Sequence, residues 1–150
     1  MKDKFALFLL LLIFSACIRT DNQTEAVQEP EAKTDGAFIH ISKGSEDAHD
    51  VLMALMLADK FSTSNDVLVF FDKQGIEMVT GDAPNLEMEP FDSSDDIFAR
   101  LVDLGVTILA CPACMQVSGV VEEDLRDGVQ VAEKEQFFEF TEGRILSLDY

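Results

Sequence analysis

The stretch that decides the fold is Gly105-Val-Thr-Ile-Leu-Ala-Cys-Pro-Ala-Cys-Met-Gln-Val-Ser-Gly119. Its apolar and partly β-branched first half, residues 106–110, is typical of a buried strand. Pro112 stands where the first residue of a helix would lie, so the pattern predicts a strand that passes through Cys-Pro-Ala-Cys directly into a helix. A thiol at such a junction meets unpaired backbone N–H groups and the positive end of the helix dipole, which favour the thiolate. We therefore expect the chemistry of this protein at Cys111 and Cys114.

Strand and helix patterns alternate on both sides of this stretch. Short apolar runs predict strands at residues 37–42, 67–71, 76–79, 129–132 and 144–148. Helical spacing of apolar residues predicts helices at residues 45–61, 95–104 and 133–140, and residues 80–94 have the glycine and prolines of a long surface loop. This alternation predicts an α/β fold with three layers, in which helices flank a mostly parallel sheet of flavodoxin-like or Rossmann-like type.

The N-terminus has the pattern of a targeting segment. Lys2 and Lys4 precede an apolar run over residues 5–14, which is about half the length that a membrane-spanning helix needs. The run ends in Ser-Ala-Cys17, which is similar to the lipobox of bacterial lipoproteins. We expect residues 1–16 to be a lipoprotein signal peptide and Cys17 to carry the lipid. An ordinary cleaved signal peptide is the alternative, and both interpretations imply export.

Two further regions follow from composition. Residues 17–36 are polar and acidic with almost no large apolar side chains, which predicts a flexible tether, and residues 37–150 are expected to form the folded domain. The expected location is therefore the bacterial cell envelope, with a lipid-anchored protein that faces the periplasm. The chain has 11 Lys and Arg against 29 Asp and Glu, a formal net charge of −18, which argues against binding nucleic acid.

Four interpretations of the Cys111–Cys114 pair remain open from the residues alone. A zinc site needs about four ligands, and this chain adds only two histidines to the pair, so we expect no metal and no cofactor. A dithiol redox pair, a persulfide carrier and a pair of inert buried thiols are the others. Other polar candidates, which we expect to be structural, solvated or engaged in surface ion pairs, are His40, His49, Arg126 and Arg144.

Three segments resemble the DsrE/DsrF-like sulfur-relay family. Residues 109–119 are similar to its cysteine segment, in which a strand ends in Cys and a Gly follows some eight places later. Residues 44–55 are similar to its first loop and helix, and residues 135–146 to its ending. The resemblance implies a DsrE-like domain that acts as a sulfurtransferase-like sulfur carrier. In such a domain Cys111 carries sulfane sulfur as a persulfide. This chain differs from the familiar members in its exported pattern and in its second thiol, Cys114.

The resemblance also implies partners: small sulfur species or a partner sulfur-carrier protein, and copies of the chain in a trimer or hexamer. The closely spaced rings of Phe137, Phe138 and Phe140 agree with self-association, because one helix face cannot direct all three into a core. Two alternatives to sulfur transfer remain: a dithiol/disulfide oxidoreductase that uses both cysteines, and a non-catalytic oligomeric binding module.

Overall fold

The computed structural model describes residues 35–140 and 143–150. The expected signal peptide, the lipid site at Cys17 and nearly all of the expected tether lie outside the described residues. The strands are β1 (Gly36–Ile41), β2 (Asp66–Phe71), β3 (Thr107–Ala110), β4 (Val129–Val131) and β5 (Ile145–Asp149). The helices are α2 (Ala48–Ser62), α3 (Ser94–Asp103), α4 (Pro112–Ser118) and α5 (Lys134–Phe140), with 3-10 turns η1 (Ser45–Asp47), η2 (Lys73–Val79) and η3 (Glu122–Asp124).

The five strands form one sheet in the order β4-β3-β2-β1-β5, and all neighbouring strands are parallel. Parallel neighbours require a crossover between successive strands, and the helices supply it. The predicted α/β class and parallel sheet are confirmed.

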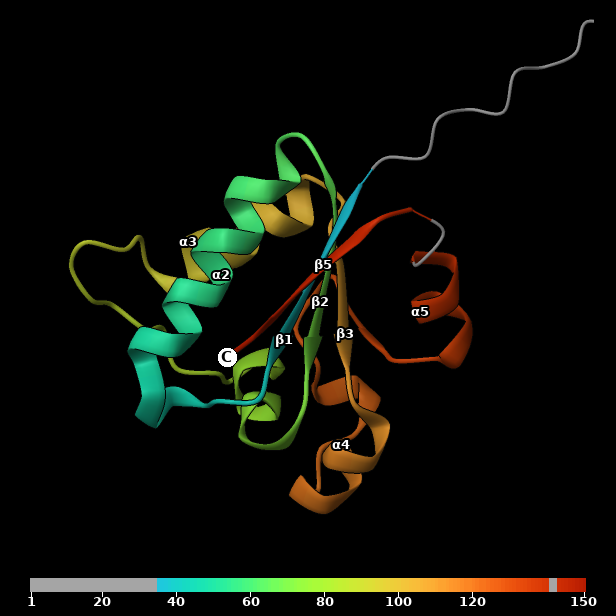
Figure 1. Ribbon diagram of the computed structural model, residues 1–150. Coiled ribbons are helices and arrows are strands. Elements are labelled where there is room, and N and C mark those ends of the chain that lie inside the picture. Colours follow the sequence, from blue (N-terminus) through green and yellow to red (C-terminus); the bar gives the residue numbers. More distant parts are fainter. Residues whose placement is uncertain (1–34, 141–142) are drawn as a thin grey trace, which may run out of the picture. The chain divides into compact units, whose positions relative to one another are not determined.

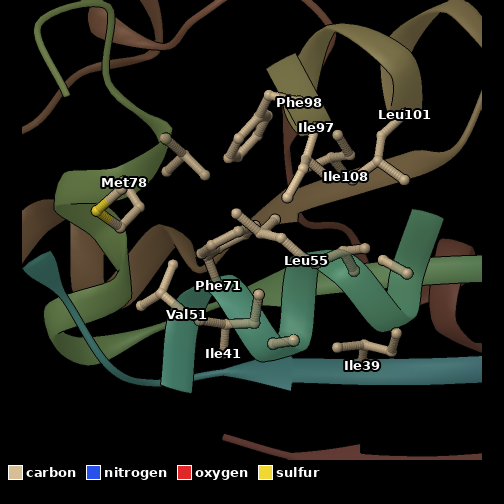
Figure 2. Close-up of a cluster of buried hydrophobic side chains, with 14 of the residues drawn as sticks. Ile39, Ile41, Val51, Leu55, Phe71, Met78, Ile97, Phe98, Leu101 and Ile108 are labelled. Atoms are coloured by element: carbon tan, nitrogen blue, oxygen red, sulfur yellow. The ribbon is translucent and has the colours of Figure 1, made fainter. Parts of the chain in front are cut away.

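Helices α2 and α3 cover one face of the sheet, and α5 covers the other face (Figure 1). Alternate residues of the strands, such as Ile39, Val69 and Ile108, are fully buried beneath α2 and α3 (Figure 2). On the opposite face the ring of Phe137 from α5 lies 5.2 Å from that of Phe70 and 6.2 Å from that of Phe38. The side-chain alternation of a strand explains why each strand contributes to both layers.

One predicted strand is wrong. Residues 76–79 were expected to be extended, but they belong to η2, in which Ile76, Met78 and Val79 are buried. The strand before this segment, β2, already pairs with β1 on one side and with β3 on the other, so no sheet edge is free beside it. Apolar residues three apart also suit a 3-10 turn, which buries Ile76 and Val79 without a ladder of hydrogen bonds.

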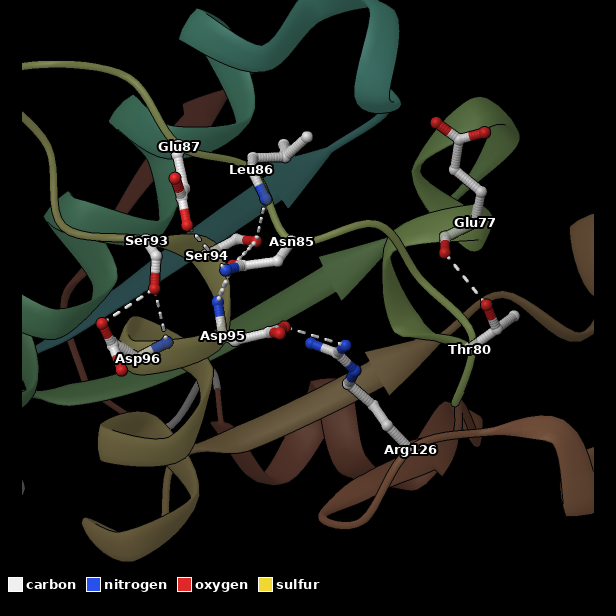
Figure 3. A network of polar contacts seen from close by, with 10 residues as sticks. All are labelled: Glu77, Thr80, Asn85, Leu86, Glu87, Ser93, Ser94, Asp95, Asp96 and Arg126. Atoms are coloured by element: carbon white, nitrogen blue, oxygen red, sulfur yellow. Dashed lines mark hydrogen bonds and ion pairs between the residues drawn. The ribbon is translucent and has the colours of Figure 1, made fainter.

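The loop between η2 and α3 is held by its own polar network (Figure 3). The backbone N–H of Leu86 donates to Ser94 Oγ at 2.8 Å, and the N–H of Ser94 returns a bond to the Leu86 carbonyl at 2.9 Å. Ser93 caps α3 by accepting from the N–H of Asp96 at 3.2 Å. The loop predicted at residues 80–94 is thus present, and its first residue, Thr80, forms an isolated antiparallel bridge with Leu125 after η3.

Among the residues that the structure describes, no helix has the length and apolar character to cross a bilayer.

Candidate functional site

The site begins where β3 ends. The backbone N–H of Cys111 donates to the carbonyl of Phe71, the last residue of the neighbouring strand, at 2.9 Å. Pro112 then begins α4. Cys111 is the N-cap residue of this helix, with an extended backbone (φ −67°, ψ 115°). The Sγ atom of Cys111 accepts a hydrogen bond from the N–H of Cys114 at 3.4 Å. The predicted passage from strand through Cys-Pro-Ala-Cys into a helix is confirmed.

The pKa of Cys111 differs from the expectation that the start of the helix favours the thiolate. Burial, and next the side chain of Cys114, raise the pKa of Cys111 above its ordinary value, although the backbone N–H groups of Cys114 and Ala113 act to lower it. The pKa of Cys111 is therefore raised even though the residue lies at the start of α4. Burial removes part of the hydration that a thiolate has in water, which disfavours the charged form more than the two N–H donors favour it.

Both cysteines of the motif are free thiols and both are half-buried. Cys111 is the N-cap of α4 and Cys114 is its third residue, so the two side chains are three positions apart and lie on neighbouring parts of the same side of the first turn. This arrangement brings together the two residues that the sequence analysis selected.

A hollow of about 830 Å³ opens beside α4. Cys114, Ala113, Val117 and Val120 form its α4 side, and η2 and the segment after it form the other; Cys111 is not among its lining residues. The η2 side is lined by Lys73, Gln74, Ile76, Glu77, Thr80 and Asp82. The volume lies in the range of small-molecule sites, and Cys114 is one of the lining residues.

The sequence analysis missed the η2 residues of this hollow, because that segment was interpreted partly as a strand. One signal was available: Lys73 and Gln74 follow β2 almost directly, and ligands of parallel sheets gather at the carboxyl ends of the strands. Figure 1 shows α4 and η2 at the same end of the sheet. Gly75 permits this placement, since a Cβ atom there would lie 2.4 Å from the carbonyl oxygen of Ile41.

The other polar candidates are engaged away from the cysteines. His49 packs on the ring of Phe91, with ring centroids 5.6 Å apart. Nδ1 of His40 donates to Asp149 Oδ1 at 2.7 Å, and its Nε2 lies 3.0 Å from Asp72 Oδ1 without the alignment of a hydrogen bond.

The two arginines behave as the sequence analysis expected. Arg126 pairs with Asp95 at 3.1 Å and its guanidinium lies 4.6 Å from the centroid of the Phe98 ring. Arg144 pairs with Asp35 through both Nε and Nη2, at 2.8 and 2.5 Å. Within residues 35–140 and 143–150, no group of three or more His, Cys, Asp or Glu side chains could hold a metal ion.

Comparison with known proteins places this site in a family context. The sequence model of the DsrE/DsrF-like family matches residues 36–142. A protein of unknown function from Methanobacterium thermoautotrophicum, MTH1491, superposes with a TM-score of 0.61 at 20% identity, over 79% of this chain and 100% of that one. The ychN protein from E. coli superposes with a TM-score of 0.53 at 17% identity, over 77% and 99% of the two chains. No curated protein matches the sequence.

Proposed function

Because the chain belongs to the DsrE/DsrF-like family, which is generally linked to sulfur relay, we propose that it binds and transfers sulfane sulfur as a persulfide on Cys111. One observation carries this proposal: two free, half-buried thiols lie one helical turn apart at the end of a central strand, beside a hollow of about 830 Å³. The donor and acceptor are small sulfur species or a partner sulfur-carrier protein.

Loading is an exchange of one sulfur–sulfur bond for another. The Cys111 thiol first loses its proton to solvent, and its thiolate attacks the terminal sulfur of a donor persulfide R–S–SH. A bond forms between Cys Sγ and that sulfur, the donor's S–S bond breaks, and the donor leaves as the thiolate RS⁻. Because the pKa of Cys111 is raised by burial, loading accelerates as the pH rises through the neutral range.

Unloading can follow two routes. In the carrier route an acceptor thiolate attacks the outer sulfur of the Cys111 persulfide, takes it as R′–S–SH and leaves Cys111 as a thiolate. In the second route the Cys114 thiolate attacks the inner sulfur, HS⁻ leaves, and a Cys111–Cys114 disulfide remains, which a two-electron dithiol reductant must then reduce. We propose the carrier route, with Cys114 able to release stalled cargo by the second.

A dithiol/disulfide oxidoreductase is the second candidate function. It is favoured by the contact between the two cysteines, in which Cys111 Sγ accepts from the N–H of Cys114 at 3.4 Å. An enzyme of this class would cycle the pair between dithiol and disulfide without retaining a sulfur atom.

Intact mass spectrometry separates these functions. The reduced protein is exposed to excess polysulfide at about 1 M salt, where the Debye length of about 3 Å screens the protein's acidic surface. Cys114→Ser should gain one sulfur atom that a reductant removes, and Cys111→Ser should gain none. Loss of two hydrogen atoms by the wild type without any sulfur gain by Cys114→Ser would instead indicate an oxidoreductase. Equal sulfur gain by the two variants would overturn the assignment to Cys111.

We further propose that the folded part assembles as a trimer or hexamer and that lipid at Cys17 anchors it, exported, to a bacterial envelope membrane. Two side chains support the assembly: Phe138 is 64% exposed and Leu146 is 52% exposed, whereas the neighbouring Phe137 packs against the sheet. The anchoring proposal depends on the sequence pattern of residues outside the described range.

A further inference from the structure

Helix α4 and the turn after it expose apolar side chains around the reacting pair. Val117 is 89% exposed and Val121 is 54% exposed. Two hollows, of about 830 and 410 Å³, adjoin this surface, and Val120 is in the lining of both. We call the surface formed by Cys114, Val117, Val120 and Val121 the α4 groove. Leaving valines in water is unfavourable, so this surface gains free energy when another surface covers it.

Carboxylates surround the α4 groove. The acidic residues that line its two hollows and the adjoining one are Glu77, Asp82, Glu122, Glu123 and Asp124. Lys73 is the one basic residue among the same lining residues. The groove therefore has an apolar centre and a strongly negative rim.

Lys73 lies in this rim, but no Lys or Arg of the described residues forms an ion pair with its carboxylates. Glu77 accepts from the backbone N–H of Ser45, and Asp124 accepts from the backbone N–H of Val121 at 3.0 Å. Asp82, Glu122 and Glu123 have no ion pair with any Lys or Arg in residues 35–140 and 143–150. The exposed carboxylates are thus available to a partner from outside the chain.

We propose that the α4 groove docks a partner protein that presents its own thiol among apolar side chains ringed by lysines or arginines. The inference rests on the proposed function in one respect, because it takes the Cys111–Cys114 pair as the reacting group. Charge complementarity selects the partner: opposite potentials across an interface speed encounter and reject like-charged surfaces. The apolar centre selects a protein over a small cation, since exposed valines need apolar atoms to cover them.

The same charges disfavour other occupants. A second copy of this chain carries a net charge of −18, so two such rims repel each other. An anionic lipid surface and free anionic polysulfide are repelled for the same reason. Self-assembly through α5 is compatible with this proposal, because α5 lies on a face of the sheet whereas α4 lies at its end (Figure 1).

Thiol–disulfide exchange with charged peptides tests the proposal without any persulfide. Two synthetic peptides of equal length each carry one cysteine as a mixed disulfide with thiopyridine, flanked by valines and by either four lysines or four glutamates. A protein thiolate attacks the peptide sulfur, the protein–peptide disulfide forms, the bond to thiopyridine breaks, and thiopyridone leaves with a change in absorbance. We expect the lysine peptide to react at least about 10-fold faster at low salt, and the ratio to approach one at about 1 M salt.

Matched variants locate the effect. Replacing Glu122 and Glu123 by Gln should reduce the preference severalfold, whereas replacing Glu135 and Glu139 of α5 by Gln removes the same charge elsewhere and should leave it unchanged. Val117→Ser should slow both peptides alike, because it removes apolar contact and no charge. At 89% exposure this substitution leaves the core intact.

Each outcome has a separate meaning. Equal rates for the two peptides at low salt, no reaction with either, or an equal loss of preference in the two glutamine variants would overturn the docking inference. The protein could instead fail to load sulfur from polysulfide and still prefer the lysine peptide through Glu122 and Glu123. That result would support the docking inference and overturn the proposed sulfur transfer.

Discussion

Gly75→Ala should destabilise the protein, because the backbone of η2 lies directly on the end of β1. A Cβ atom at Gly75 would lie 2.4 Å from the carbonyl oxygen of Ile41, and 3.3 Å from the Ile41 carbonyl carbon and from Cδ1 of Phe71. The first contact is with backbone, which cannot rotate away. Either η2 or the end of β1 must move, and the hydrogen bond from the N–H of Asp72 to the Ile41 carbonyl, at 3.1 Å, lies on the same oxygen.

The expected loss follows from three contributions. Overpacking of a tight contact costs about 1–3 kcal/mol. Weakening the Asp72–Ile41 hydrogen bond costs about 0.5–1.5 kcal/mol. Reduced freedom of the unfolded chain returns about 0.4–1 kcal/mol. The net decrease in the free energy of unfolding is about 2 kcal/mol, which for a domain of this size lowers Tm by roughly 6–12 °C.

Denaturant and thermal unfolding, followed by circular dichroism, measure this loss. Gly81→Ala is the matched control, because a Cβ atom there meets its nearest neighbour, the Asp124 carbonyl oxygen, at an ordinary 3.7 Å. We expect the control to be neutral or slightly stabilising. If Gly75→Ala unfolds within about 0.5 kcal/mol of the control, which is the usual spread of harmless substitutions, the close approach of η2 to β1 is not as the structure has it.

Three other predictions concern the thiols and the assembly. Cys114→Ala should lower the pKa of Cys111, because it removes a side chain that raises that pKa and keeps the backbone N–H; an unchanged pH profile of Cys111 alkylation would contradict this. Light scattering of residues 37–150 at micromolar concentration should give a trimer or a multiple of it, and a monomer mass would refute self-assembly. Cys17→Ala should release the protein from membranes or block processing, and unchanged fractionation with unchanged intact mass would argue against a lipid anchor.

The fold was largely predictable because its signals are local. Each strand of the sheet has a short apolar run and each long helix has a stripe of apolar residues, and alternation of the two leaves few topologies other than a parallel sheet. The segment containing Ile76 and Val79 was not predictable in this way. Its apolar pattern suits a strand or a 3-10 turn equally, and what decides is whether a neighbouring sheet edge is free, which depends on the pairing of β2 with strands distant in sequence.

The position of the candidate site was likewise readable from local sequence, whereas its chemistry was not. Pro112 and the apolar run before it were enough to place Cys111 at the N-cap of α4. The pKa of that thiol depends also on how much solvent the rest of the fold removes, and burial proved to be the largest influence. Burial is a property of tertiary packing, so no motif of four residues contains it.

Net charge, like a local motif, does not predict the chemistry of the site. Function depends on where the charges lie and not on their sum. Two arginines form ion pairs with aspartates outside the site. Arg100 pairs with Asp59 and Asp92 at 3.0 and 2.9 Å, and Arg126 pairs with Asp95. Neither arginine pairs with a carboxylate that lines the hollows beside α4. A total of −18 does not say where the charges lie, whereas the fold gathers carboxylates around exposed valines and a free thiol, and the proposed discrimination among partners depends on that arrangement.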